Sequence, residues 1–203
     1  RHTRAVYVSY HPDLAVPGAA ESIESFVELA ADHGVQRLVL LSRRGEDEAQ
    51  RVEEILCRSE PEWTILRASW LAQNFSESFL WEGILAGEVM LPDADVPEPF
   101  IDADDVAEVA VAALTERGHA GARYDLTGRR MLTFEDAVRE IADGLGRPIR
   151  HVPVSREQFA ESLARQGTSA TIAWLLYYLF GTVLDGRNAS LTSDVERVLH
   201  RQP

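Results

Sequence analysis

Short apolar runs alternate along the chain with segments in which apolar residues recur every three or four positions. The run Arg37–Ser42 (RLVLLS) is almost entirely apolar, which is typical of a strand covered on both faces. Before it, apolar residues from Glu21 onward fall on one helical face, and Gly34 follows where a helix would end. Further strands are predicted at residues 4–10, 63–67, 100–101, 123–127 and 149–154, and further helices at residues 46–58, 70–86, 104–117 and 133–145, with helical sequence after Ser155.

This alternation of strands and helices predicts the class of fold. Short connections from strand to helix to strand imply right-handed crossovers, and hence an α/β, Rossmann-like fold with a doubly wound parallel sheet. We expect residues 1–128 to form this sheet domain and residues 129–203 to form a small, mostly helical region. Sheets of this type bind ligands at the carboxyl ends of their strands, so candidate site residues are sought there.

The segment Ser169–Leu184 (SATIAWLLYYLFGTVL) is nearly all apolar. It is shorter than the roughly 20 residues that a membrane span needs, and it ends at Asp185. A buried helix, or a lid over an apolar pocket, is therefore the interpretation that we favour.

Charge and cysteine content narrow the class of partner. The 203 residues include 33 acidic and 20 basic side chains, for a formal charge of −13. This acidity opposes binding to nucleic acid or to anionic membranes, because neutralising phosphates requires clustered Lys and Arg. The single cysteine, Cys57, excludes an intrachain disulfide and fits a reducing cytosol, so we expect a cytoplasmic protein whose ligand is a small molecule.

Familiar catalytic motifs are missing from these residues. The sequence contains no G-x-G-x-x-G, P-loop, G-x-S-x-G, H-E-x-x-H or paired C-x-x-C, which removes most hydrolase and metalloenzyme interpretations. What remains are residues at predicted strand ends. Ser42 is either a hydroxyl at a reaction centre or a cap for the next helix. His11 either contacts a ligand or is an exposed turn residue.

The turn after the strand at residues 63–67 carries the densest group of such residues. Arg67, Ser69, Trp70, Gln73 and Asn74 are polar or amphipathic and follow one another closely. Helical spacing would place Gln73 and Asn74 on the same side as Trp70, forming an apolar pocket wall with two amide anchors. The alternative is that Trp70 belongs to the core.

Two other groups have plainer interpretations. Asp102, Asp104 and Asp105 suggest a metal site, but carboxylates that open a helix are the stronger interpretation, and no metal is expected. Cys57 lies on the inward side of a predicted helix, where a buried, inert thiol is expected.

Five segments, taken together and in order, resemble one known family. They are VYVSYHP at 6–12, GVQRLVLLS at 34–42, WTILRASWLAQNF at 63–75, FIDADDVAEVAVAAL at 100–114 and YDLTGRRMLTFEDAVREIADGLGRPIRHVPVS at 124–155. The chain resembles the NmrA-like NAD(P)H-binding proteins, an atypical branch of the short-chain dehydrogenases/reductases. Within that branch it is most similar to bacterial relatives of the festuclavine and agroclavine dehydrogenases of ergot alkaloid biosynthesis, which reduce an imine or iminium with NADPH.

The resemblance implies an oxidoreductase of secondary metabolism with NADP or NAD as cofactor, bound by residues 1–128. Residues implied near the cofactor are Ser9, Tyr10, His11, Ser42, Arg67 and Ser69, with Ser42 as a weak catalytic candidate. Residues implied around the substrate are Trp70, Gln73, Asn74 and Phe75 as a pocket wall, with Trp81 and the segment of Trp174 and Tyr177 as a lid. Ala68 stands where the family usually has proline, so the turn is expected to be looser.

Two departures from the family pattern change these expectations. The family's glycine-rich phosphate loop lies on its first strand, and this chain resembles the family only from about the fourth strand. The strand at residues 4–10 is too apolar for a free edge, so we expect a second neighbour, from upstream residues or from another subunit as in a homodimer.

The family's Tyr-x-x-x-Lys pair is the second departure, because its positions fall near Gly45 and Ala49, which cannot act as acids. Ketone reduction is therefore disfavoured, whereas an iminium needs only a positioned hydride. We expect reduction of a small hydrophobic imine, iminium or quinone-like molecule without Tyr-Lys acid catalysis. The alternatives are a non-catalytic NAD(P)-binding redox sensor and a non-redox cyclase or isomerase.

Overall fold

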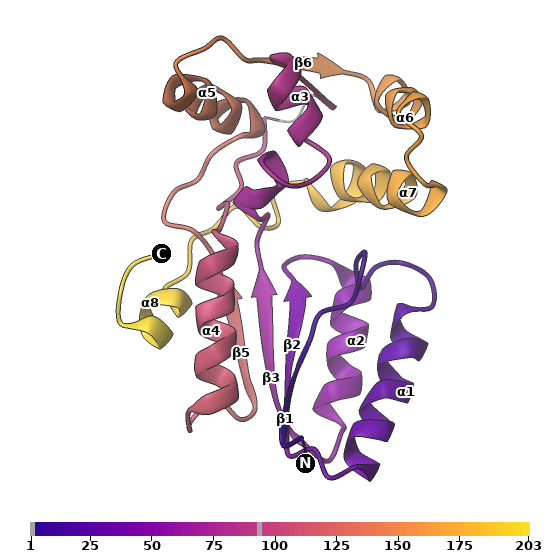
Figure 1. Ribbon diagram of the computed structural model, residues 1–203, viewed down its shortest axis with the longest axis vertical. Helices are drawn as coiled ribbons and strands as arrows, with labels where there is room; N and C mark the ends of the chain where they lie inside the picture. The colour runs from indigo at the N-terminus through magenta and orange to yellow at the C-terminus, as the bar shows by residue number, and fades with distance from the viewer. Residues whose placement is uncertain (1–2, 93–94) are drawn as a thin grey trace. The chain divides into compact units, whose positions relative to one another are not determined.

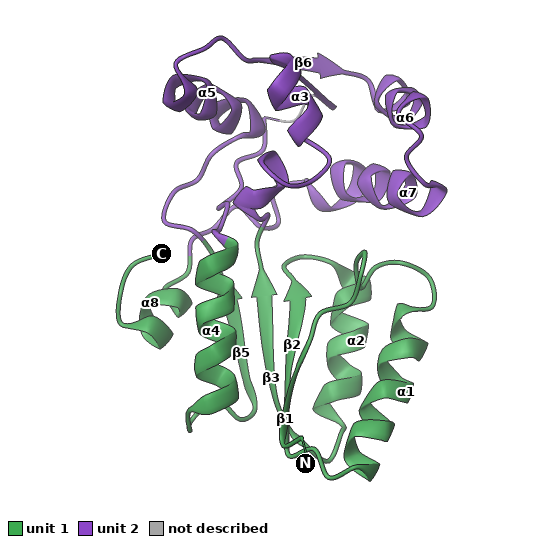
Figure 2. Ribbon diagram, viewed as in Figure 1, with its two compact units in different colours: residues 1–69, 103–127, 192–203 green, residues 70–102, 128–191 purple. Residues whose placement is uncertain are grey.

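A computed structural model of the chain describes residues 3–92 and 95–203 (Figure 1). The chain forms two compact units, and it crosses between them four times (Figure 2). Unit 1 contains the chain up to Ser69 together with Ala103–Thr127 and Thr192–Pro203, and unit 2 contains Trp70–Asp102 and Gly128–Leu191. The predicted boundary after residue 128 lies next to one of these crossings. Which unit has which function stays a prediction.

Unit 1 contains a four-stranded parallel sheet in the order β1-β2-β3-β5, as far as the described residues show. Its strands are β1 (Ala5–Val8), β2 (Arg37–Arg43), β3 (Glu62–Ala68) and β5 (Ala122–Leu126), and its helices are α1 (Ala19–Asp32), α2 (Asp47–Cys57), α4 (Ala103–Thr115) and α8 (Asp194–Leu199). The predicted Rossmann-like α/β fold with a parallel sheet is confirmed.

The burial of β2 shows that helices cover both faces of the sheet. Leu38, Val39 and Leu40 are all 0% exposed, which confirms that this strand is covered on both faces. Leu38 and Leu40 belong to one apolar cluster with residues of α1 and α2. Val39 points to the opposite side, where α4 contacts β1, β2 and β3.

Among the described residues β1 pairs only with β2, so it is an edge strand of this sheet. It is also shorter than predicted, and Tyr7 remains 38% exposed. The expectation of a second neighbour for β1 stays a prediction.

A buried carboxylate on α2 forms hydrogen bonds and an ion pair with side chains of the unit 1 sheet. Glu53 is 1% exposed, and it accepts a hydrogen bond of 2.6 Å from the Ser42 hydroxyl. Arg67 donates to it from Nε at 2.9 Å and from Nη2 at 2.6 Å. Ser42 and Arg67 are direct neighbours in the register of β2 and β3, so one carboxylate joins both strands to α2. The hydrogen bond to Glu53 raises the pKa of Arg67.

Unit 2 has a separate two-stranded parallel sheet, and its other elements are mostly helical. Its strands are β4 (Glu88–Pro92) and β6 (Arg150–Val154), and its helices are η1 (Ala72–Phe75, 3-10), α3 (Trp81–Ala86), α5 (Phe134–Leu145), α6 (Arg156–Arg165), α7 (Ala170–Tyr178) and η2 (Leu179–Val183, π). Thr133 and Ser155 form capping boxes that begin α5 and α6. Leu145, the last residue of α5, is 56% exposed.

The prediction of one continuous helix over residues 70–86 is wrong. The segment forms only η1 and α3, and its start is extended backbone. The reason is a long-range pairing: Ile101 donates its N–H to the Trp70 carbonyl at 2.9 Å, and Ala72 donates to the Ile101 carbonyl at 2.8 Å. These groups are therefore unavailable for helical hydrogen bonds, and the predicted strand at residues 100–101 is reduced to a single bridge.

Aromatic rings fill the core of unit 2. The ring of Trp70 lies 5.1 Å from that of Phe134, edge to face, and 5.2 Å from that of Phe180. Phe180 comes from η2, at the end of the apolar segment that follows Ser169, so that segment contributes to this core. Among the described residues, no helix is long and apolar enough to cross a membrane.

The Glu53 network predicts a large difference between two adjacent glutamates. Glu53→Gln should lower the free energy of unfolding by about 3 kcal/mol, because it leaves Arg67 without its counter-charge. Glu54→Gln is the matched control, because Glu54 pairs with Arg58 on the surface, where an ion pair contributes less than about 1 kcal/mol. Urea unfolding of both variants measures the difference. Equal losses of unfolding free energy in the two variants would show that the Glu53 network does not stabilise the packing of α2 on the sheet.

The aromatic core predicts a similar contrast between two tryptophans of unit 2. Trp70→Ala should lower the free energy of unfolding by about 3 kcal/mol or more, because a large ring is removed from a packed cluster. Trp174 is 44% exposed on α7, so Trp174→Ala should lower the free energy of unfolding by less than about 1 kcal/mol. Thermal unfolding measures both values. If Trp70→Ala leaves the melting temperature unchanged, Trp70 is not a core residue.

Candidate functional site

The carboxyl ends of the unit 1 strands form the first part of the candidate site. Because all four strands are parallel, their ends lie at one edge of the sheet. Ser9, Tyr10 and His11 follow β1 directly, and Ser69 follows β3. Ser9 and His11 are exposed, whereas Tyr10 is half-buried against the apolar cluster beneath the edge. Sequence reasoning therefore selected residues that the topology brings to one edge, and their contact with a cofactor stays a prediction.

Ser42 and Arg67 point toward Glu53 at the ends of their strands. Ser42 is 0% exposed, and its hydroxyl donates to Glu53 rather than capping a helix. The N-cap of α2 is Glu46, so the interpretation of Ser42 as a helix cap is wrong. Ser42 and Arg67 thus hold the strand ends in place, and whether either touches a ligand stays a prediction.

The donors at this edge suit a dinucleotide. Arg44 donates from Nη1 to the Ser69 hydroxyl at 3.3 Å, while the Ser69 N–H donates to the Leu126 carbonyl. Guanidinium and hydroxyl groups are the usual donors to ribose and phosphate oxygens. The donor set of this edge therefore fits the ribose of NAD or NADP, while a glycine-rich phosphate loop is not among these residues.

A pair of buried acids at the same edge was missed by sequence reasoning. Asp13, in the loop after β1, is 5% exposed, and Glu46, at the start of α2, is 3% exposed. Their side chains are hydrogen-bonded to each other, and Arg43 donates from Nε to Asp13 at 3.2 Å. Burial and the neighbouring Asp13 raise the pKa of Glu46 to about 9. The polar run GEDEAQ at residues 45–50 gave no sign of this, because it has the composition of an exposed helix start.

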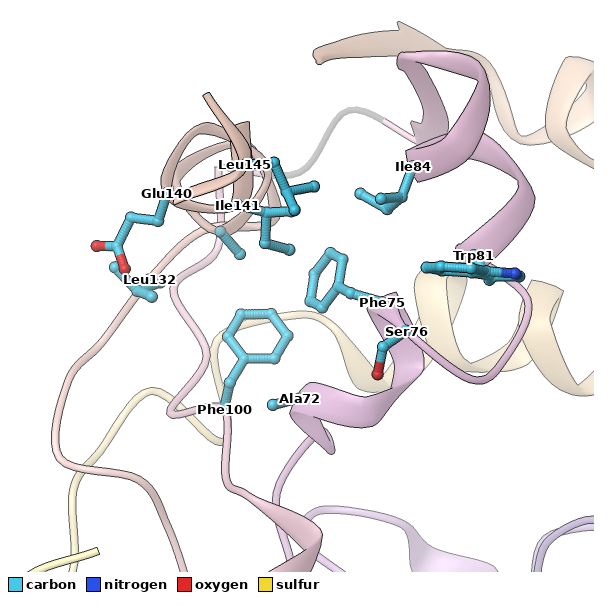
Figure 3. A pocket seen from close by; sticks show the side chains of 11 residues that line it. Ala72, Phe75, Ser76, Trp81, Ile84, Phe100, Leu132, Glu140, Ile141 and Leu145 are labelled. Atoms are coloured by element: carbon cyan, nitrogen blue, oxygen red, sulfur yellow. The ribbon is translucent and has the colours of Figure 1, made fainter. Parts of the chain in front are cut away.

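Unit 2 contains a cavity of about 490 Å³ (Figure 3). Its walls are mainly apolar and come from η1, α3, α5 and the segments before α4 and α5. The lining residues are Ala72, Phe75, Ser76, Trp81, Ile84, Phe100, Leu132, Ala137, Glu140, Ile141 and Leu145. Figure 3 shows the rings of Phe75 and Phe100 on one side of Ile141. The carboxylate of Glu140 is paired with Nη1 and Nη2 of Arg130, and the rest of the lining is mainly apolar, as in many small-molecule pockets.

The predicted substrate residues divide into separate groups. Phe75 and Trp81 line the cavity, whereas Trp70 packs in the aromatic core, and the argument from helical spacing is wrong because no helix begins at Trp70. Gln73 donates from Nε2 to Asp102 at 2.8 Å, and Asn74 is half-buried and donates its backbone N–H to the Leu71 carbonyl. Trp174 and Tyr177 are 44% and 45% exposed on α7. Contact of any of them with substrate stays a prediction.

The remaining candidates have structural partners. Asp104 and Asp105 lie in the first turn of α4, as carboxylates that open a helix should, and Asp105 accepts from Arg201 at 2.7 Å. Cys57 is only half-buried, so the expectation of a fully buried thiol is wrong, and it accepts a hydrogen bond from Arg123 at 2.8 Å.

Comparison with known proteins identifies relatives along most of the chain. It is 31% identical over 182 residues to the uncharacterized oxidoreductase YesF of Bacillus subtilis, covering 88% of this chain and 64% of that protein. It is 30% identical over 199 residues to the agroclavine dehydrogenase of Claviceps fusiformis, covering 94% of this chain and 67% of the dehydrogenase. The chain thus spans about two thirds of the length of these relatives.

Solved structures agree on the fold. The NADPH-dependent quinone oxidoreductase QOR2 of Escherichia coli, in complex with NADPH, superimposes with a TM-score of 0.83 at 19% identity, over 99% of this chain and 72% of that structure. No protein-family model matches the sequence. The identity to the agroclavine dehydrogenase, together with its coverage of both chains, establishes the relationship: the chain belongs to the NmrA-like, atypical short-chain dehydrogenase/reductase family.

Proposed function

We propose that this protein is an NAD(P)H-dependent oxidoreductase that reduces a small hydrophobic imine, iminium or quinone-like molecule. The observation that carries the proposal is the single edge at which β1, β2 and β3 end in a member of this family. That edge collects hydroxyl, imidazole and guanidinium groups from three loops. The relatives' names support the same chemistry, since they include an agroclavine dehydrogenase and an NADPH-dependent quinone oxidoreductase.

Different residues of this edge are proposed to bind different parts of the cofactor. Ser9, Tyr10 and His11 are proposed to contact the cofactor's ribose, and Ser69 the region near nicotinamide. Ser42 and Arg67 are fixed by the buried Glu53, so the edge has one arrangement before any ligand arrives. Such preorganisation lowers the entropy cost of orienting bound groups. When bound, NAD(P)H would supply the hydride.

The apolar cavity of unit 2 favours a hydrophobic substrate. Its aromatic and aliphatic lining has few polar groups, and its volume is in the range that suits small organic molecules. We propose that Phe75 and Trp81 hold the apolar part of the substrate there. By the register of the family resemblance, the tyrosine and lysine positions fall near Gly45 and Ala49, and neither of these residues supplies an acid.

The proposed function can be tested directly by measuring cofactor binding and cofactor oxidation. The purified protein should bind NADPH or NADH and should oxidise it when an aromatic iminium or a quinone is added. Absorbance of the reduced nicotinamide measures the rate, and calorimetry measures cofactor binding. Binding without oxidation of any such compound would favour a redox sensor. Neither binding nor oxidation would favour a non-redox enzyme.

The cavity predicts a matched pair of variants on α3. Trp81→Ala should raise KM for a hydrophobic substrate about tenfold, which corresponds to about 1.4 kcal/mol of lost contact. Leu85 is 56% exposed on the same helix and does not line the cavity, so Leu85→Ala should leave KM unchanged. Steady-state kinetics with both variants measures the effect. Equal KM values would remove the cavity from the substrate site while leaving the reductase assignment in place.

A further inference from the structure

The cavity of unit 2 combines aromatic walls with a carboxylate. Phe75, Trp81 and Phe100 are among its lining residues, and Glu140 is the one charged side chain among the described residues that line it. The rings of Phe75 and Phe100 have their centres 5.5 Å apart and are inclined at 60°. In Figure 3, Glu140 and Trp81 lie on opposite sides of the cavity, with these two rings between them. A ligand in the cavity therefore meets aromatic rings along its length and a carboxylate on one side.

The charges around this lining favour a positively charged ligand. None of the described lining residues is Lys, Arg or His, so an anion would meet no counter-charge in the cavity, whereas Glu140 offers one to a cation. Aromatic rings add to this preference, because their faces carry partial negative charge and attract cations. The formal charge of −13 on the chain acts in the same direction at longer range.

Arg130 pairs with the Glu140 carboxylate, but this ion pair is open to exchange. Nη1 and Nη2 of Arg130 donate to Oε1 and Oε2 of Glu140 at 2.8 Å and 2.6 Å. The two side chains remain 57% and 45% exposed. An ion pair this exposed contributes little net stability, because water screens it and two long side chains must be ordered to form it. A cation with an aromatic body also gains contacts with the cavity wall, and Arg130 is not among the residues of that wall. Such a ligand can therefore displace Arg130 from Glu140.

We propose that the unit 2 cavity selects a flat aromatic cation, with Glu140 as the specificity-determining residue and Arg130 as the competing guanidinium that the ligand displaces. The inference rests on the proposed reductase function and deepens it, since it names the cationic iminium, rather than the neutral imine or quinone, as the preferred substrate class. Ligand charge then sets the affinity together with apolar area. The two halves of one ion pair consequently have opposite effects on binding.

Three probes that share one ring system test the charge preference without cofactor or turnover. N-methylquinolinium is a permanent cation, quinoline is uncharged at neutral pH, and quinoline carboxylate is an anion. Isothermal titration calorimetry should give a Kd for N-methylquinolinium about tenfold below that for quinoline, which corresponds to about 1.4 kcal/mol. The anion should bind more weakly than quinoline. Equal Kd values for the cation and for quinoline would overturn the proposal.

Substitutions in the ion pair provide the decisive comparison. Glu140→Gln should raise the Kd of the cation about tenfold and leave that of quinoline unchanged, because it removes the counter-charge and keeps the size of the side chain. Arg130→Gln should lower the Kd of the cation about threefold or more, because the competing guanidinium is gone. Both variants break the same ion pair, so a merely structural role would move both Kd values in the same direction. Shifts of the same sign would overturn the proposal.

A second glutamate on α5 is the matched control. Glu135 pairs with Arg139 on the surface and does not line the cavity. Glu135→Gln changes the net charge of the protein by the same amount as Glu140→Gln, and it should bind the cation as the parent protein does. An equal loss of affinity in Glu135→Gln would show that the overall charge, and not Glu140, attracts the ligand. Circular dichroism checks that all three variants are folded.

Turnover separates this inference from the reductase assignment. With an N-alkyl iminium as substrate, Glu140→Gln should raise KM about tenfold and change kcat by less than about threefold, because it removes a binding interaction. KM for a quinone should stay unchanged. Charge-selective binding by a protein that oxidises no NAD(P)H would refute the reductase and leave the cavity's preference in place. Oxidation of NAD(P)H with the same KM for the iminium in the parent and in Glu140→Gln would refute the role of Glu140 alone.

Discussion

The need to neutralise one buried carboxylate determines how unit 1 is organised. Glu53 lies on α2 with 1% exposure, and a charge in that position is tolerated only if donors surround it. Ser42 supplies a hydroxyl and Arg67 two guanidinium nitrogens, each from the end of a different strand. Satisfying Glu53 therefore fixes the distance and register of β2, β3 and α2 together. The edge that we propose as the cofactor site is built from those same strand ends, so its geometry follows from this constraint.

One helix carries two buried acids in opposite situations, and the difference lies in the donors around them. Glu53 is paired with Arg67 and lies 3.8 Å from the guanidinium of Arg123. Glu46, seven residues earlier, faces Asp13, and the nearest guanidinium, that of Arg43, is already bonded to Asp13. A lone arginine shared by two acids leaves one of them protonated. Glu53 on α2 is thus a charged structural anchor, whereas Glu46, the N-cap residue of the same helix, has a pKa raised to about 9.

Local sequence patterns were sufficient for the sheet, because the strand of residues 37–42 and the helices around it satisfy their hydrogen bonds within themselves or with predicted neighbours. They failed at residues 70–86, where Ile101, distant in the sequence, takes the backbone groups of Trp70 and Ala72. The candidate site likewise combines residues that sequence could predict with residues whose environment depends on distant parts of the chain. Strand-end residues such as Ser9 and Ser69 follow from topology, but burial of Glu46 depends on a loop that folds back from β1. No local pattern distinguishes it from the exposed Asp47 beside it.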